Sequence, residues 1–112
     1  MKKLRVLNVE DSENDSTLLI RHLTRGGYDI YVERVENQAE MKAALESKEW
    51  DIIISDYQMP KFNGLLALNV LHESGLDIPF IIISGTIGEV LAVEAMVAGV
   101  NDYMMKDNLA RL

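Results

Sequence analysis

The stretch Ile52-Ile53-Ile54-Ser55-Asp56-Tyr57-Gln58-Met59-Pro60 decides the fold, because an apolar run leads straight into a carboxylate and then into a break in the chain. A short apolar run bounded by turn signals is typical of a strand buried on both faces, as in a parallel sheet covered by helices. Pro60 disfavours a helical conformation at Met59, and Gly64 frees the backbone before the next helical pattern. We therefore expect the chain to turn here and to leave Asp56 at the exposed carboxyl end of the strand.

Strand and helix patterns alternate on both sides of this stretch. The other strands are predicted at residues 4–9, 28–35, 80–83 and 100–105. Helices are predicted from the N-cap Ser12 to Gly26, from about 37 to 47, from 65 to 74 and from 88 to 98. This alternation predicts a single α/β domain over residues 1–112, a doubly wound five-stranded parallel sheet with helices on both faces. A fifth helix after Asp107 would be truncated, because fewer than two turns remain.

Composition excludes several classes of protein. The 112 residues are 48% hydrophobic, and no run approaches the roughly 20 apolar residues of a membrane span. The net charge of −7 argues against direct nucleic-acid binding, which needs clustered Lys and Arg. The chain has no cysteine, which excludes disulfides and thiolate metal sites, and its amino terminus does not resemble a signal peptide. We expect a cytoplasmic globular protein with no membrane association.

Polar side chains follow four of the predicted strands at the point where each strand ends. They are Glu10 and Asp11, Asp56, Ser84, and Lys106. The carboxyl ends of parallel strands meet at one edge of the sheet, where α/β proteins bind ligands. We therefore expect three carboxylates, a hydroxyl and an ammonium group to gather there.

The charges of this group indicate a cation. Three neighbouring carboxylates repel one another, and with Lys106 their sum is about −2, which one divalent ion would balance. Carboxylate oxygens without His or Cys favour Mg²⁺, with Mn²⁺ as the other option. A cation, a lysine and a hydroxyl around one carboxylate also favour phosphoryl transfer, with Asp56 attacking in line.

These residues resemble the receiver domain of two-component response regulators. The resemblance rests on Glu10-Asp11, on the run from Asp56 through Met59-Pro60 to Gly64, on Ser84-Gly85 and on Lys106, which match in identity and in order. It covers nearly the whole chain, and it implies a flavodoxin-like sheet of strand order 2-1-3-4-5. It also implies that Asp56 accepts a phosphoryl group from a phosphohistidine on a sensor histidine kinase or a phosphotransfer protein, and that the chain catalyses only its own phosphorylation and dephosphorylation.

The family resemblance implies a role for each residue of the site. Mg²⁺ would be held by Glu10, Asp11, Asp56 and the backbone carbonyl of Gln58. Lys106 would contact the phosphoryl oxygens, and Ser84 and Tyr103 would act as the switch that follows the phosphate. Gln58 and Thr86 would tune hydrolysis. This chain has Asp107 where the family often has a proline after a cis peptide bond, so we expect a trans bond there.

Phosphorylation would switch the binding of a partner or output domain that the sequence does not identify. At about 100° per residue, one face of the predicted fourth helix carries Val90, Val93 and Val97, and Glu89 and Glu94 bracket that face. This apolar face is a candidate dimer or docking surface, and packing into the core is the alternative.

Two other functions are compatible with the pattern. The chain could be a receiver-like interaction module that does not use phosphorylation. It could also be a small flavin-binding protein of flavodoxin-like fold, although such a protein would carry its phosphate loop after the first strand, where this chain has Glu10 and Asp11.

Overall fold

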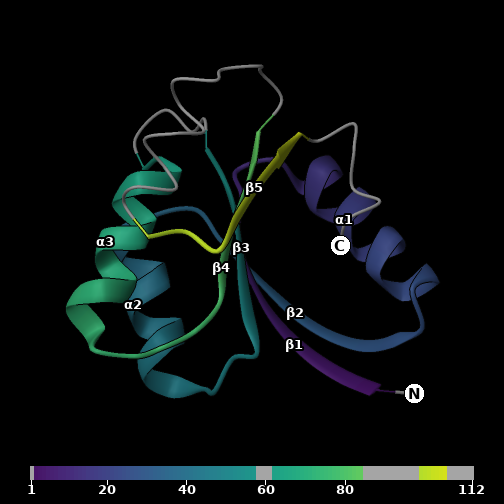
Figure 1. The fold of residues 1–112 in the computed structure, drawn as a ribbon, viewed down its shortest axis with the longest axis horizontal. Coiled ribbons are helices and arrows are strands. Elements are labelled where there is room, and N and C mark those ends of the chain that lie inside the picture. The colour runs from purple at the N-terminus through teal and green to yellow at the C-terminus, as the bar shows by residue number, and fades with distance from the viewer. Residues whose placement is uncertain (1, 58–61, 85–98, 106–112) are drawn as a thin grey trace.

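The computed structural model describes residues 2–57, 62–84 and 99–105, and for residues 2 and 103–105 it describes the backbone alone. Strands and helices alternate through this part of the chain, as the sequence predicts (Figure 1). The strands are β1 (Lys2–Val9), β2 (Tyr28–Val35), β3 (Ile52–Asp56), β4 (Phe80–Ser84) and β5 (Asp102–Met105). The helices are α1 (Glu13–Arg25), α2 (Gln38–Ser47) and α3 (Gly64–Ser74). The predicted helices over residues 88–98 and 107–112 lie outside the described residues, as do Val90, Val93 and Val97.

The five strands form one sheet of order β2-β1-β3-β4-β5, and every neighbouring pair is parallel. This is the predicted order. Helix α1 covers one face of the sheet, and α2 and α3 cover the other (Figure 1). The doubly wound α/β architecture expected from the sequence is therefore confirmed.

Each described helix begins at a side chain that caps it. Ser12, Asn37 and Asn63 are the N-caps, and each side-chain oxygen accepts a hydrogen bond from the backbone N–H three residues later, at 3.2, 2.9 and 2.9 Å respectively. Such a bond satisfies one of the N–H groups that the first turn leaves without an intrahelical partner. Helix α3 ends at Gly75, whose φ of 76° lies in the left-handed region that glycine adopts without a steric penalty.

Successive residues of the inner strands face opposite sides of the sheet and enter two separate cores. The larger core lies toward α2 and α3 and includes Leu7, Ile53 and Ile82, with Met41 from α2. The smaller core lies toward α1; its buried members are Val6, Leu19, Leu23, Ile54 and Ile83. Both faces of β3 are covered, which explains why the strand is apolar on both faces, as the run Ile52-Ile53-Ile54 indicates.

The strand order fixes where a site can form. β1 lies between β2, which follows it in the chain, and β3, so the connections after β1 and β3 leave in opposite directions. Doubly wound sheets bind ligands at such a reversal, outside the carboxyl ends of the strands. Among the described residues, no helix is long and apolar enough to cross a membrane.

Candidate functional site

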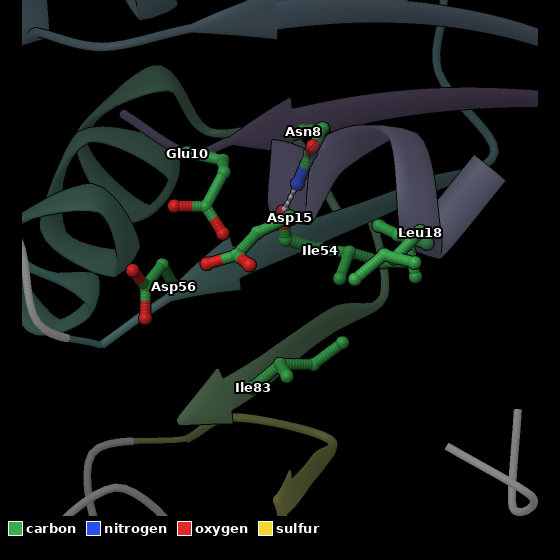
Figure 2. A pocket seen from close by; sticks show the side chains of 8 residues that line it. Asn8, Glu10, Asp15, Leu18, Ile54, Asp56 and Ile83 are labelled. Carbon is green, nitrogen blue, oxygen red and sulfur yellow. Dashed lines mark hydrogen bonds between the residues drawn. The ribbon is translucent and has the colours of Figure 1, made fainter. Parts of the chain in front are cut away.

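Three carboxylates meet at the carboxyl ends of β1 and β3. One oxygen from each of Glu10, Asp11 and Asp56 can be chosen so that all three lie within 4.8 Å of one another. Glu10 is 4% exposed and Asp56 is 6% exposed, whereas Asp11 is exposed to solvent. Figure 2 shows the Glu10 and Asp56 side chains turned toward a common space at the end of the sheet. The structure thus brings together the three acidic residues that the sequence predicted as a group.

Backbone and side-chain hydrogen bonds hold Glu10 in place. Its N–H donates to the carbonyl of Val35 at 3.0 Å, which continues the β1–β2 ladder by one residue. Its carboxylate accepts from the N–H of Ser12 at 3.3 Å. Its carbonyl accepts from Arg34 Nη1 at 3.2 Å. The chain just before Asp11 is therefore tied to the end of β2.

Asp56 is fixed through its neighbours in the chain. The Tyr57 N–H donates to the Ile83 carbonyl at 3.1 Å, so pairing with β4 continues just past Asp56. The Ser55 hydroxyl is fully buried and donates to the Asp56 carbonyl at 2.9 Å. Gly64, at the start of α3, donates its N–H to the Tyr57 carbonyl at 3.1 Å. These bonds hold the backbone on both sides of the carboxylate.

Asn8 is a residue of this region to which sequence analysis assigned no role. It lies in β1, two residues before Glu10, and is 2% exposed. Its amide nitrogen donates to the Ile54 carbonyl at 2.9 Å, the bond drawn in Figure 2, and its amide oxygen accepts from the Ser16 hydroxyl at 2.6 Å. One amide within the apolar residues 6–9 that end β1 is the signal that could have identified it, because buried polar groups are almost always hydrogen-bonded.

A small pocket of about 50 Å³ opens beside the carboxylates (Figure 2). Its polar wall includes Asp15 of α1, whose N–H donates to the N-cap Ser12. The apolar wall comes from α1, β3 and β4; it consists of Leu18, Leu19, Ile54 and Ile83. The pocket therefore has an acidic side and an apolar side.

The donor set fits a small hard cation. All three groups offer carboxylate oxygens, which are ligands that Mg²⁺ prefers. Ligands on opposite sides of an octahedral Mg²⁺ are about 4.2 Å apart, twice the metal–oxygen distance. The 4.8 Å spread is slightly wider, so a small side-chain adjustment or a ligating water would complete the coordination.

The described part of the chain contains two of the other predicted site residues. Ser84 ends β4 and is fully buried, one residue after Ile83, which is the register partner of Asp56. Tyr103 lies in β5 and pairs with Ile82, and its backbone alone is described. Gln58, Thr86, Lys106 and the Lys106–Asp107 peptide bond lie outside the described residues.

Two arginines pair with carboxylates, and these pairings shift pKa values from their ordinary range. A hydrogen bond with Glu36 raises the pKa of the Arg34 guanidinium above its ordinary value, at the same end of the sheet as the carboxylates. Just before the amino end of β3, hydrogen bonds from Arg5 lower the pKa of the Asp51 carboxyl. Each arginine thus neutralises part of the charge of an acidic neighbour.

Known proteins are similar to this chain in sequence and in architecture. The family model of the response regulator receiver domain matches residues 6–112. The chain is 31% identical to the alkaline phosphatase synthesis transcriptional regulatory protein PhoP of Bacillus subtilis, over 91% of this chain and 42% of PhoP. It is 30% identical to a chemotaxis protein CheY homolog of Campylobacter jejuni, over 92% of this chain and 81% of the relative. The chain thus spans less than half of PhoP but most of the CheY homolog.

Solved structures of similar proteins have the same fold as this chain. FixJ-N superposes with a TM-score of 0.82 at 28% identity, over 99% of this chain and 87% of that one. The receiver domain of the sensor histidine kinase PA1611 from Pseudomonas aeruginosa, solved with a magnesium ion in its active-site cleft, superposes with a TM-score of 0.76. That domain is 25% identical over 95% of this chain and 87% of its own. From its sequence, its strand order and its carboxyl-end acidic group, this chain belongs to the family of receiver domains of two-component response regulators.

Proposed function

We propose that this chain is a phosphoacceptor domain in which Asp56 takes a phosphoryl group from a phosphohistidine and so changes the binding of a partner. One observation carries the proposal. A nearly buried carboxylate lies at the end of the central strand, with carboxylate oxygens of Glu10 and Asp11 within 4.8 Å of its own. Carboxylates that would otherwise repel one another at this distance are typical of a cation-assisted site.

The proposed reaction transfers one phosphoryl group between two side chains. A carboxylate oxygen of Asp56 attacks the phosphorus in line, the new O–P bond forms, and the P–N bond to the donor histidine breaks. The electron pair of that bond returns to the imidazole. Later attack by water on the phosphorus releases inorganic phosphate and restores the Asp56 carboxylate. The chain acts on its own side chain and has no separate substrate to turn over.

The proposed ligands of Mg²⁺, or of Mn²⁺ in its place, are Glu10, Asp11, Asp56 and the backbone carbonyl of Gln58. The bound ion would neutralise charge on the phosphoryl oxygens as the group moves. Glu10 supports this assignment because hydrogen bonds to its backbone and its carboxylate hold it in place before any ion arrives. A ligand positioned in advance loses little freedom on binding.

The switch is proposed to involve Ser84 and Tyr103, with Lys106 on the phosphoryl oxygens and with Gln58 and Thr86 tuning hydrolysis. Moving a two-state equilibrium from 1:99 to 99:1 requires about 5.5 kcal/mol of differential interaction. A single hydroxyl hydrogen bond to a charged group contributes about 1.5–3 kcal/mol. Ser84 therefore cannot act alone, and the ammonium of Lys106 or a bound partner has to share the work.

A sensor histidine kinase or a phosphotransfer protein is the proposed phosphoryl donor, acting in the cytoplasm. PhoP of Bacillus subtilis is named as a transcriptional regulatory protein, and the CheY homolog of Campylobacter jejuni as a chemotaxis protein. Receiver domains thus serve different outputs, and fold similarity does not choose between them. Val90, Val93 and Val97 remain a proposed docking or dimer face.

The proposal is tested by incubating the purified chain with Mg²⁺ and a small phosphodonor, followed by intact-mass measurement. The wild type is expected to gain the mass of one phosphoryl group, and Asp56→Asn none, because the amide is a poor nucleophile. A wild type that gains no mass with several donors, while it binds Mg²⁺, would favour the interaction module that does not use phosphorylation.

A further inference from the structure

Arg34 is not one of the three clustered carboxylate residues, but its side chain donates a hydrogen bond to the backbone of Glu10. It belongs to β2, where it pairs in register with Asn8 of β1. Its side chain extends past the end of the strand, and Nη1 donates to the Glu10 carbonyl at 3.2 Å. The same Nη1 forms an ion pair with the Glu36 carboxylate. The guanidinium therefore joins the connection after β1 to the connection after β2.

The bond from Arg34 ends on the carbonyl of Glu10, the first of the proposed cation ligands along the chain. Glu10 supplies one carboxylate, and Asp11, the next residue, supplies another. The Glu10 N–H is already fixed by the Val35 carbonyl at 3.0 Å. With the Arg34 bond in place, both backbone polar groups of Glu10 are tied to the end of β2, so the peptide that leads into Asp11 is restrained at its carbonyl oxygen.

From this arrangement we propose that Arg34 is a positioning residue for the cation site, which sets the affinity for Mg²⁺ without contacting the ion. The inference rests on the proposed function, since it concerns the same site. Residues that orient metal ligands from behind commonly change metal affinity by 10- to 100-fold when replaced. Because a single bond of moderate length is involved, we expect an effect of about tenfold, at the lower end of that range.

If Arg34 acted only through its charge, its replacement would change the Mg²⁺ affinity in the opposite direction. A binding measurement can therefore decide between the two roles. Arg34 is positive and lies at the same end of the sheet as the carboxylates, so removing its charge makes the surroundings more negative and more attractive to a cation. Loss of positioning weakens Mg²⁺ binding, whereas loss of charge alone strengthens it. The direction of the change therefore separates the two effects.

Arg5 provides a matched control. Like Arg34, Arg5 lies in a strand and is paired with acidic residues; it belongs to β1 and donates to Asp51 and Glu49 at 3.1–3.4 Å. It lies in the amino-terminal half of β1, whereas the carboxylates lie at and beyond the carboxyl ends of β1 and β3. Replacing Arg5 or Arg34 by Met changes the net charge equally, so the comparison isolates the contact with Glu10.

The experiment is isothermal titration of Mg²⁺ into the full chain at constant ionic strength, for the wild type and the variants Arg34→Met, Arg34→Gln, Arg34→Lys and Arg5→Met. We expect the Kd for Mg²⁺ to rise about tenfold in Arg34→Met and in Arg34→Gln, whose amide is on a shorter side chain. The rise should be smaller in Arg34→Lys, which keeps a charged donor on a long side chain for the Glu10 carbonyl. Arg5→Met should stay within about twofold of the wild type. Circular dichroism identifies folded variants, and Arg34→Gln decides the matter if Arg34→Met does not fold.

A Kd for Arg34→Met or Arg34→Gln that equals the wild-type value or falls below it would overturn the inference. Equal weakening in Arg5→Met would also overturn it, because the effect would then follow net charge or general stability. Failure of the proposed function has a different signature, since the wild type itself would then bind no Mg²⁺ or gain no phosphoryl group.

Discussion

Asn8 and Ile54 are joined across the β1–β3 pair by a hydrogen bond of 2.9 Å from the Asn8 amide to the Ile54 carbonyl. The bond lies two residues before Glu10 on one strand and two residues before Asp56 on the other. Asn8 also accepts from the Ser16 hydroxyl of α1 at 2.6 Å. One buried amide therefore links the two strands that carry the carboxylates to the helix beside them.

Asn8→Leu should lower the free energy of unfolding by about 1–3 kcal/mol, because two buried polar groups lose Asn8 as a partner. Ser16→Ala should cost about 1 kcal/mol, since the Asn8–Ile54 bond remains. Urea unfolding followed by circular dichroism measures both.

The double variant Asn8→Leu/Ser16→Ala is the control for this network. Because Asn8 and Ser16 are hydrogen-bonded, their effects should fall short of additivity by at least about 0.5 kcal/mol. Strictly additive losses would show that the two side chains do not depend on each other.

Gly64→Ala should destabilise the protein by about 1–3 kcal/mol and slow phosphorylation of Asp56. An added Cβ would lie 3.1 Å from the Asp56 carbonyl oxygen and 3.3 Å from Tyr57 Cα, both backbone atoms that cannot turn aside. This crowding outweighs the gain in helix propensity of at most about 1 kcal/mol. Unfolding by urea and the initial rate of mass gain measure the two effects.

Gly26→Ala is the comparison for Gly64→Ala, because Gly26 has an ordinary φ of −73° and lies at the end of α1. Its added Cβ would have one backbone neighbour, the Leu23 carbonyl, at 3.3 Å. We expect a change of less than about 1 kcal/mol and no effect on the rate. Equal losses in the two variants would exclude crowding against Asp56 as the cause.

Asp11→Asn should have opposite effects on stability without and with Mg²⁺. In the metal-free protein it relieves repulsion from Glu10 and Asp56, worth about 1 kcal/mol for a solvated pair at this separation. With Mg²⁺ present, the variant should lose the stabilisation that binding gives the wild type. Thermal unfolding with a chelator and with Mg²⁺ should therefore rank the two proteins in opposite orders, and an unchanged order would count against a shared cation site.

The ion pair between Arg5 and Asp51 should make stability depend on pH in the acid range. The pKa of the Asp51 carboxyl is lowered in the folded state by its hydrogen bonds with Arg5. Its contribution is therefore fully present above the unfolded-state pKa of about 3.9 and is lost as the pH falls through the lower folded-state value. The stability difference between wild type and Asp51→Asn should be constant from pH 5 to 7 and should shrink below about pH 4. A difference that grows on acidification would contradict this account.

Much of the fold could be predicted from the sequence because local signals and burial agree. Ser12, Asn37 and Gly75 mark helix ends by their own chemistry, and the structure confirms each of them. The apolar run of β3 is buried on both faces, as its lack of alternation predicts. The strand order came from family resemblance, since the helix and strand patterns do not determine which strands are neighbours.

The candidate site was only partly predictable. Glu10, Asp11 and Asp56 were found because each lies at or just after the carboxyl end of a strand, which fixes its place at one end of a parallel sheet. Asn8 and Arg34 act through hydrogen bonds to backbone carbonyls of other strands, and such partners depend on register and side-chain reach. An asparagine or arginine within a strand carries no sequence signal for which carbonyl it will reach.

The central claim is that Asp56 accepts a phosphoryl group in a site completed by a cation on Glu10 and Asp11. The most direct test is the fraction of the Asp56-containing peptide that carries a phosphoryl group after incubation with a small phosphodonor, measured by mass spectrometry over a range of Mg²⁺ concentrations. The account predicts negligible labelling in chelator, a saturable rise with Mg²⁺, and no labelled peptide in Asp56→Asn. Labelling that is independent of Mg²⁺, or that falls on a carboxylate other than Asp56, would contradict it.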